Sequence, residues 1–181
     1  MSDSKEILAV GSIAFDSIHT PKGNRDKILG GSSTYFSVAS SRYTNTSLIG
    51  VVGQDFTDNE WKLFRDYNIN TESIEICKGD TFSWGGKYNE DYSRRDTLFT
   101  HLGVFEHFKP KINTKYNKPI LYLGNIQPEL QLDVISKVKS PHLIAADSMN
   151  LWIDLFPKDV IELIKKVNIF LLNDEEARQL T

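Results

Sequence analysis

Three segments in the first third of the chain indicate its architecture: ILAVGSIAFD at residues 7–16, ILGGSSTYF at 28–36 and GVVGQD at 50–55. Each joins an apolar run to glycine, and the first ends on Asp16. A continuous apolar run bounded by glycine is typical of a strand that is buried on both faces of a parallel sheet. In open α/β sheets, ligands bind at the carboxyl ends of such strands. The segments therefore predict a parallel sheet with a ligand site near Asp16 and Gly30-Gly31.

The same pattern extends along the chain as alternating strands and helices, which predicts a doubly wound α/β domain. The predicted strands are 7–10, 15–20, 47–52, 120–123, 143–146 and 169–172. The predicted helices are 33–43, capped by Ser32 or Ser33, then 58–67, 128–138, 158–167 and one beginning at Asp174.

The middle of the chain has a different character. Residues 73–77, 81–88 and 97–102 read as β segments without an intervening helix, which predicts a small sheet set apart from the main one. Phe82, Trp84 and Tyr88 share one parity, so they predict an aromatic face that packs on the core or on a partner. Gly85-Gly86 predicts a bulge or a close backbone approach.

Composition narrows the class of protein. The 181 residues carry a net charge of −3, so the basic face of a nucleic-acid-binding protein is not expected, and the Arg94-Arg95 and Lys165-Lys166 pairs are interpreted as solvated surface. Cys77 is the only cysteine, which excludes an internal disulfide and fits a reducing compartment. The polar residues 1–6 precede an apolar run too short for a signal peptide or a membrane span, so a cytoplasmic protein without a membrane partner is expected.

Other common sites are not supported by the sequence. The four histidines lack the spacing of a zinc site, and the Walker A, dinucleotide-binding and nucleophile-elbow motifs are missing. These absences argue against P-loop kinases, dinucleotide-binding dehydrogenases and serine hydrolases.

The chain resembles the ribokinase-like carbohydrate kinases, also called the PfkB family. The matching motifs are residues 11–16, Gly30-Gly31, 50–55, the β-rich middle and Asn173-Asp174-Glu175-Glu176, and they extend over nearly the whole chain. Three further segments resemble a bacterial and archaeal subgroup of sugar kinases: 81–84, 125–129 and 147–152. The resemblance implies a three-layer αβα domain over residues 1–181, incomplete at its C-terminus, with a β lid formed by about residues 14–29 and 72–103.

The resemblance also implies an activity and roles for individual residues. Family members transfer the γ-phosphoryl of ATP to a hydroxyl of a sugar or nucleoside with Mg2+. Asp16 would accept hydrogen bonds from sugar hydroxyls, with Gly30 and Gly31 close to the sugar, and Trp84 and Asn125 are further candidate contacts. Asn173 and Glu176 would organise Mg2+ and phosphate through water. The lid would exclude water, and its sheet would support a homodimer.

Two departures from the family pattern limit this interpretation. Residues 32–36, Ser-Ser-Thr-Tyr-Phe, lack the asparagine that often contacts the sugar. The Gly-Ala-Gly-Asp motif, which carries the family's catalytic base and anion hole, is also missing, so the resemblance places that base beyond Thr181, the last residue. We therefore expect a chain that corresponds to the front part of a kinase, with no catalytic residue of its own and negligible kinase activity alone.

Several alternatives remain open at this point. The chain could be a non-catalytic sugar-binding or regulatory protein, or the product of a decayed coding sequence. Each site residue also has a structural interpretation: Asp16 as a turn acid, Gly30-Gly31 as a tight loop, Asp55 and Asp147 as caps, and Asn173 with Glu176 as a helix-start motif.

Overall fold

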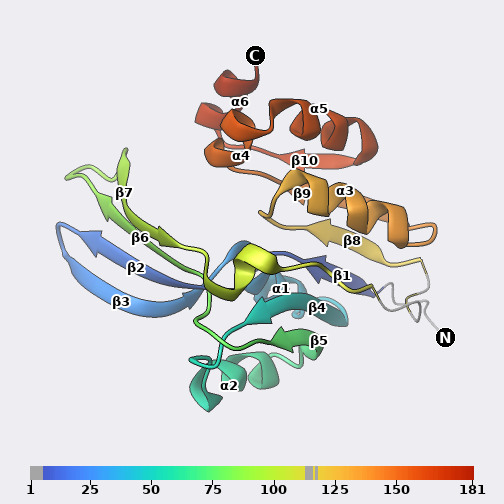
Figure 1. Ribbon diagram of the computed structural model, residues 1–181, viewed down its shortest axis with the longest axis horizontal. Helices are drawn as coiled ribbons and strands as arrows, with labels where there is room; N and C mark the ends of the chain where they lie inside the picture. Colours follow the sequence, from blue (N-terminus) through green and yellow to red (C-terminus); the bar gives the residue numbers. More distant parts are fainter. Residues whose placement is uncertain (1–5, 113–115, 117) are drawn as a thin grey trace.

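The computed structural model describes residues 6–112, 116 and 118–181, and it contains two sheets (Figure 1). The expectation about the polar N-terminus largely concerns residues 1–5, which lie outside this range. Within the described residues, no helix combines the length and apolar character needed to cross a bilayer.

Six parallel strands form the main sheet in the order β10-β9-β8-β1-β4-β5. They are β1 (Ile7–Val10), β4 (Thr46–Val52), β5 (Asn70–Ile76), β8 (Ile120–Leu123), β9 (Leu143–Asp147) and β10 (Ile169–Leu171). The central strands β1 and β4 are almost wholly buried because both faces of the sheet are covered. The predicted parallel α/β architecture is therefore confirmed.

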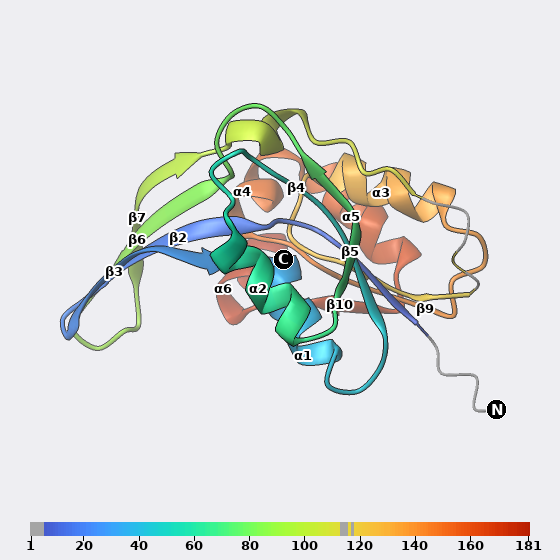
Figure 2. The ribbon, with the colours of Figure 1, turned by 90° about the horizontal axis from the view of Figure 1, so that it is seen from below.

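Helices cover both faces of the main sheet (Figure 2). They are α1 (Ser32–Ser40), α2 (Asp58–Asp66), the 3-10 helix η1 (Gly103–His107), α3 (Pro128–Lys137), α4 (Asn150–Leu155), α5 (Pro157–Lys166) and α6 (Asp174–Leu180). One core cluster packs η1, α3 and α5 against the sheet through Phe105, Val134 and Leu163. The other packs α1 and α2 on the opposite face, where Phe64 is 1% exposed.

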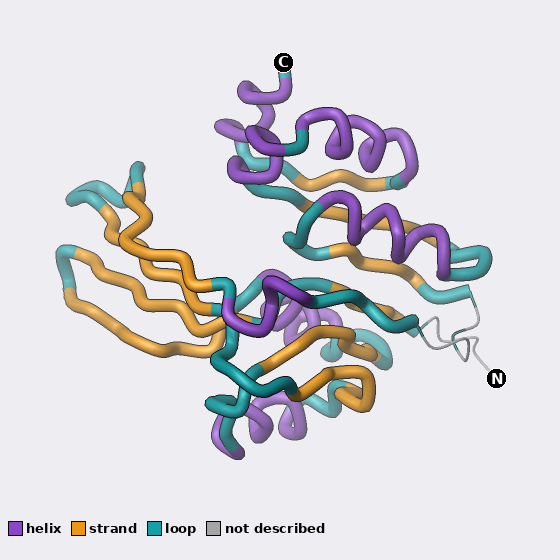
Figure 3. The backbone as a smooth tube through the Cα atoms, in the orientation of Figure 1, coloured by secondary structure: helices purple, strands orange, loops and turns teal. Residues whose placement is uncertain are grey.

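The second sheet leaves the main sheet at the carboxyl ends of its strands (Figure 3). It has the order β3-β2-β6-β7 and comprises β2 (Ala14–Thr20), β3 (Gly23–Gly30), β6 (Ser83–Tyr88) and β7 (Arg95–His101). Strands β2 and β6 run parallel and pair from Phe15 and Ser83 onward, although they lie far apart in the sequence. The expected irregularity occurs between Gly85 and Gly86, where the register on the opposite strand skips Leu98.

Several sequence predictions were wrong in detail. Residues 73–77 were expected in the small sheet, but β5 pairs with β4 in the main sheet. The isolated sequence cannot distinguish the two, because both sheets need a strand of similar composition. Neither Ser32 nor Ser33 caps α1, because Gly31 occupies the N-cap position without a side-chain bond. Strand β3 falls within the predicted β lid of about residues 14–29 but had not been predicted as a separate strand, and the short helix α4 was not predicted.

The expected aromatic face is also divided. Phe82 precedes β6 and stacks on Phe105 of the core at a centroid distance of 5.3 Å. Only Trp84 and Tyr88 lie within β6 itself, and both are half-buried. Phe82 therefore contributes to the core rather than to the sheet surface.

Candidate functional site

The candidate site begins where β1 and β8 end side by side. Gly124 donates its backbone N–H to the carbonyl of Val10 at 2.7 Å, and a Cβ on Gly11 would lie 3.0 Å from the Gly124 Cα. The chain passes from β1 to β4 on one side and returns to β8 on the other, so this is the topological switch point of the sheet. In open α/β sheets, the crevice for ligands lies at such a point.

A network of backbone and serine contacts fixes the loop that enters α1. Gly31 has φ +93°, and a Cβ there would come within 2.4 Å of the carbonyl oxygen of Ser12. That carbonyl accepts from the backbone N–H and the Oγ of Ser33, at 3.2 and 2.7 Å. The Oγ of Ser12 accepts from the backbone N–H of Ser32 at 3.1 Å. Glycine is therefore required at position 31 by both its conformation and the space available.

Asp16 is the acid that this loop holds. Its carboxylate accepts a hydrogen bond from the backbone N–H of Gly31. A Cβ on Gly30 would lie only 2.0 Å from Oδ2 of Asp16, so glycine at position 30 makes room for the carboxylate. Burial raises the pKa of Asp16, while the charge of Arg95 and the Gly31 hydrogen bond oppose that rise. A half-buried acid with these neighbours is suited to accept hydrogen bonds from a polar ligand.

Further side chains lie near Asp16. Trp84 is its direct neighbour across the β2–β6 pairing, and the guanidinium of Arg95 lies 5.1 Å from the centroid of the Trp84 ring. Burial raises the pKa of the Tyr35 hydroxyl, and the charges of Asp16 and Tyr88 raise it further. The structure thus brings Trp84, a predicted site residue, to the same place as Asp16 and the two glycines.

Arg95, Tyr35 and Tyr88 had not been predicted to contribute to the site. Arg95 is exposed, as expected for the Arg94-Arg95 pair, but it lies over Trp84. Tyr35 falls in the segment 32–36, where the family's asparagine is missing. The missing asparagine was the feature of the sequence that could have indicated a different ligand contact in this segment.

A polar cavity of about 770 Å³ lies between the β6–β7 hairpin and the loops and helices at the C-terminal edge of the main sheet. Its lining includes Tyr88 and Arg95 from the hairpin side, and Met149, Asn150 and Asn173 from the sheet side. The volume is in the range of small-molecule sites. Asn173 therefore lines the same cavity as Tyr88 and Arg95, two neighbours of the Asp16 site.

Asn173 and Glu176 form a capping box at the start of α6. The Oδ1 of Asn173 accepts from the backbone N–H of Glu176 at 2.8 Å, and Oε2 of Glu176 accepts from the N–H of Asn173 at 3.0 Å. Glu176 is 6% exposed. Asn173 and Glu176 therefore form the helix-start motif that the sequence offered as the structural alternative. Their part in binding phosphate or magnesium stays a prediction.

Asp147, at the end of β9, lies half-buried near Glu176 of this motif. Its Oδ2 accepts from the Tyr122 hydroxyl at 2.6 Å, while its Oδ1 is buried without a hydrogen-bond partner among the described residues. Burial raises the pKa of Asp147 to about 6, against the opposing Tyr122 hydrogen bond, and the charge of Glu176 adds to the rise. Burial and the charge of Asp147 likewise raise the pKa of Tyr122. A carboxyl group in such a setting is a candidate for function.

Asn125 already makes hydrogen bonds to α4 and to the residue that precedes it. Its Oδ1 accepts from Nε1 of Trp152 at 2.7 Å, and its Nδ2 donates to Sδ of Met149 at 3.0 Å. Met149 lines the cavity, whereas Asn125 does not. Asn125 therefore supports the cavity wall, and direct contact between Asn125 and a substrate stays a prediction.

Asp55 ties the main sheet to the second sheet. Its Oδ1 accepts from the backbone N–H and the Oγ1 of Thr81, at 2.8 and 2.7 Å. Thr81 Oγ1 in turn accepts from the backbone N–H of Gly53 at 2.9 Å. These contacts agree with the structural role that the sequence favoured for Asp55.

Solved structures of similar fold are abundant, although no protein-family model and no curated protein matches the sequence. A ribokinase from Cryptococcus neoformans var. grubii, solved with ADP, has a TM-score of 0.80 and 18% identity, and the match covers 99% of this chain. The chain has the ribokinase fold. A nucleoside kinase of the ribokinase family from Methanocaldococcus jannaschii has a TM-score of 0.78 and 19% identity over 97% of this chain. An uncharacterized sugar kinase from Pyrococcus horikoshii has a TM-score of 0.70 and 25% identity over 96%.

This ribokinase-fold chain is shorter than its structural neighbours. It spans 63% of the Methanocaldococcus kinase, 60% of the Cryptococcus ribokinase and 67% of the Pyrococcus kinase. Sugar and nucleoside kinases thus share its fold over almost the entire chain. The predicted ribokinase-like fold with a second, small sheet is confirmed.

Thr181, beyond which the family resemblance places the catalytic base, follows the last turn of α6. It occupies the C-cap position, and its Oγ1 donates to the carbonyl of Ala177 at 3.2 Å. The side chain of Thr181 is exposed and lines none of the cavities described here. Thr181 therefore has a local role at the helix end, and a catalytic base beyond it stays a prediction.

Proposed function

We propose that this chain forms the sugar-binding part of a PfkB-type sugar kinase, which transfers the γ-phosphoryl of ATP to a hydroxyl of a sugar or sugar-like substrate. The observation that carries the proposal is the setting of Asp16. Its carboxylate lies half-buried at the switch point, oriented by the Gly31 N–H and given room by Gly30. A carboxylate so held can accept from two adjacent hydroxyls, the arrangement that a polyol offers.

The neighbours of Asp16 fit the same ligand. Trp84 and Tyr88 offer ring surfaces that pack on the apolar face of a sugar ring, and Arg95 is a donor to ring or hydroxyl oxygens. Strands β2, β3, β6 and β7 form the proposed lid, and Asp55 anchors its base through Thr81. Closing this sheet over the ligand would exclude water from the reacting phosphoryl group.

The residues around Asp147 fit a magnesium site that works through water. Mg2+ keeps several waters and takes one or two carboxylates. Asp147 offers a buried oxygen without a hydrogen-bond partner among the described residues, and the Glu176 carboxylate is close enough to perturb it. No cluster of three potential metal ligands occurs in the described part of the chain, so water would complete the coordination. When bound, Mg2+-ATP would supply the phosphoryl group, and Asn173 and Glu176 would orient its hydration shell.

Calorimetric titration with a panel of sugars and sugar acids, with and without ATP, tests the proposal. We expect at least one sugar to bind, and Asp16→Asn to weaken its binding about 10- to 100-fold, because each hydrogen bond to a charged acceptor contributes about 1.5–3 kcal/mol. Asp26→Asn is the matched control, since Asp26 lies on β3 with an exposed side chain paired to His19. Equal binding by the wild type and the Asp16→Asn variant would contradict the assignment.

The effect of ATP on sugar binding separates the proposed function from the alternative. A non-catalytic sugar-binding protein would bind the sugar with no effect of ATP, whereas the sugar-binding part of a kinase would bind it differently when ATP is present. Release of ADP is measured in parallel, and turnover well above background would contradict the expectation that this chain alone has negligible kinase activity. The two readouts depend on different groups, so sugar binding can be confirmed even where transfer is not observed.

We also propose homodimerisation through the second sheet. Strands β3 and β7 are the open edges of this sheet. On β7, Leu98 is 47% exposed to solvent. Open edges with exposed apolar residues favour pairing with another strand. Light scattering should show a dimer that Leu98→Lys weakens, and a monomer at all concentrations would refute this.

A further inference from the structure

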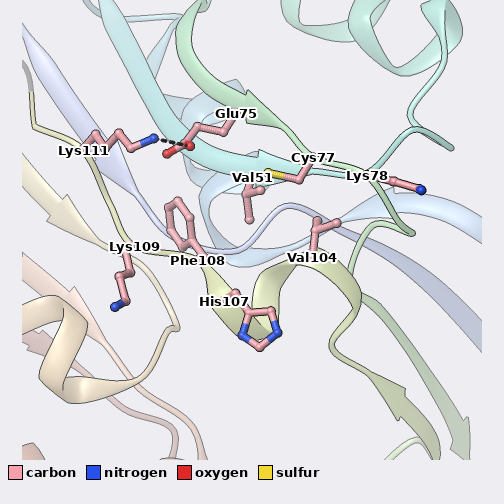
Figure 4. A pocket seen from close by; sticks show the side chains of 9 residues that line it. All are labelled: Val51, Glu75, Cys77, Lys78, Val104, His107, Phe108, Lys109 and Lys111. Atoms are coloured by element: carbon pink, nitrogen blue, oxygen red, sulfur yellow. Dashed lines mark hydrogen bonds and ion pairs between the residues drawn. The ribbon is translucent and has the colours of Figure 1, made fainter.

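A second cavity, of about 400 Å³, is lined by residues of β4, β5 and the segments that follow β5 and β7 (Figure 4). It opens between the end of β5 and the segment from η1 to Lys111. Neither Asp16 nor any residue of the α1 loop lines it. This cavity is therefore separate from the proposed sugar site, and nothing in the kinase function above makes use of it.

The floor of this cavity is apolar. Val51 and Phe108 are 2% and 4% exposed and belong to the main core cluster. Val104 and Cys77 pack partly buried against the same cluster. Figure 4 shows the Cys77 sulfur beside Val51 in this floor. The cavity can therefore take an apolar group and remove it from water.

The rim of the cavity is basic. It carries Lys78, Lys109 and Lys111 and a single acid, Glu75, which is paired to Lys111 at 2.7 Å. Within the part of the chain that the structure describes, no ion pair is found for Lys78 or Lys109. Figure 4 shows these two lysines on opposite sides of the opening, with their ammonium groups directed away from the Val51–Phe108 floor. Their long stems would have to turn for the ammonium groups to reach an occupant. The positive rim contrasts with the net charge of −3 of the whole chain.

From this combination we infer that the cavity binds a small amphipathic anion, with an aromatic or aliphatic body on the Val51–Phe108 floor and a carboxylate or phosphate between Lys78 and Lys109. The apolar floor and the two rim lysines are complementary to such a ligand. An anion at the rim would be attracted by the charges of both Lys78 and Lys109, and it would not have to break the ion pair between Lys111 and Glu75.

Two of the connections between the main sheet and the lid pass along this cavity. Cys77 and Lys78 lie on the connection from β5 to β6, and Val104 to Lys109 on that from β7 to β8. The two are joined by the backbone hydrogen bond from Val104 N–H to the Asp80 carbonyl at 2.9 Å. A bound anion would therefore contact both connections at once.

Fluorescence anisotropy of 1-naphthyl phosphate and 1-naphthoate tests the inference on the whole chain, and the two probes distinguish a phosphate from a carboxylate ligand. We expect saturable binding, weakened about tenfold or more in a Lys78→Gln/Lys109→Gln variant, because two favourable charge interactions are lost. The control variant Lys22→Gln/Lys166→Gln removes two exposed lysines elsewhere and should bind as the wild type does. Asp16→Asn should also leave probe binding unchanged, so this result is independent of the sugar site.

Cys77 maps the bound probe to the cavity, since it is the only thiol in the chain. Its reaction with the neutral reagent 4,4′-dithiodipyridine should slow when either anionic probe is bound. The neutral analogue 1-naphthalenemethanol should protect much less. Absence of probe binding, or binding that survives the Lys78→Gln/Lys109→Gln change, would overturn the inference, as would equal protection by the neutral analogue.

Discussion

Replacing Asp147 by asparagine should change how the stability of the protein depends on pH. Burial raises the pKa of Asp147 from its ordinary value of 3.8 to about 6 in the folded chain. The folded state therefore holds this proton more tightly than the unfolded chain. The carboxyl group stabilises the fold fully below pH 3.8, and this contribution is lost as the pH rises through about 6.

The size of the effect follows from the two pKa values. The difference between the two pKa values corresponds to a contribution of about 3 kcal/mol to the free energy of unfolding. Most of this contribution is lost between about pH 4 and pH 7. Asparagine cannot ionise, and its carbonyl can still accept the Tyr122 hydrogen bond. The free energy of unfolding of the wild type, measured relative to Asp147→Asn, should therefore fall by roughly 2–3 kcal/mol over that range.

Urea unfolding followed by circular dichroism at several pH values measures this difference directly. Taking the difference between the two proteins cancels the titration of the other acids. Asp133→Asn, on the surface of α3 and paired with Lys137, is the matched control and should change stability by less than about 1 kcal/mol at every pH. A difference for Asp147→Asn that stays constant, or that grows in favour of the wild type as pH rises, would refute the reasoning.

Three other changes give direct tests. Gly30→Ala should reduce sugar affinity at least about tenfold in calorimetry, because its Cβ would lie 2.0 Å from Oδ2 of Asp16 and must displace the carboxylate. Asp55→Asn should lower the free energy of unfolding by about 1–2 kcal/mol, because the two hydrogen bonds that Oδ1 accepts from Thr81 lose their charged acceptor. Gln131→Leu should cost about 2–4 kcal/mol in urea unfolding, because the fully buried amide shares its two N–H groups among the carbonyls of Leu123, Gly124 and Asp147, which would lose this donor.

Controls accompany these three changes. Asp58→Asn removes an exposed acid paired with Arg65 and should cost less than about 1 kcal/mol. Gln179→Leu removes an exposed amide and should cost far less than Gln131→Leu. If Gly30→Ala lowers the melting temperature without changing sugar affinity, the space beside Asp16 serves only the fold. Costs for Asp55→Asn or Gln131→Leu no larger than those of the controls would contradict the buried hydrogen bonds.

The elements of the main sheet could be predicted because their signals are local. The apolar run Ile7–Val10 and the proline at the start of α3 specify a buried strand and a helix start wherever they occur. The pair Asn173 and Glu176 likewise forms its capping box from residues close together in the sequence. Asp16, Gly30 and Gly31 were singled out by the resemblance to the ribokinase-like kinases, and their part in binding a ligand stays a prediction.

Tertiary structure alone decided the contacts between residues far apart in the chain. Strand β5 belongs to the main sheet because it pairs with β4. The composition of β5 does not indicate with which strand it pairs. Arg95 reaches Asp16 only because β6 lies between β2 and β7 and holds both strands in one sheet. The raised pKa of Asp147 depends on burial and on Glu176, which belongs to a later helix. Local sequence determines backbone preference and periodicity, whereas burial, charge proximity and cavities arise only once distant segments pack together.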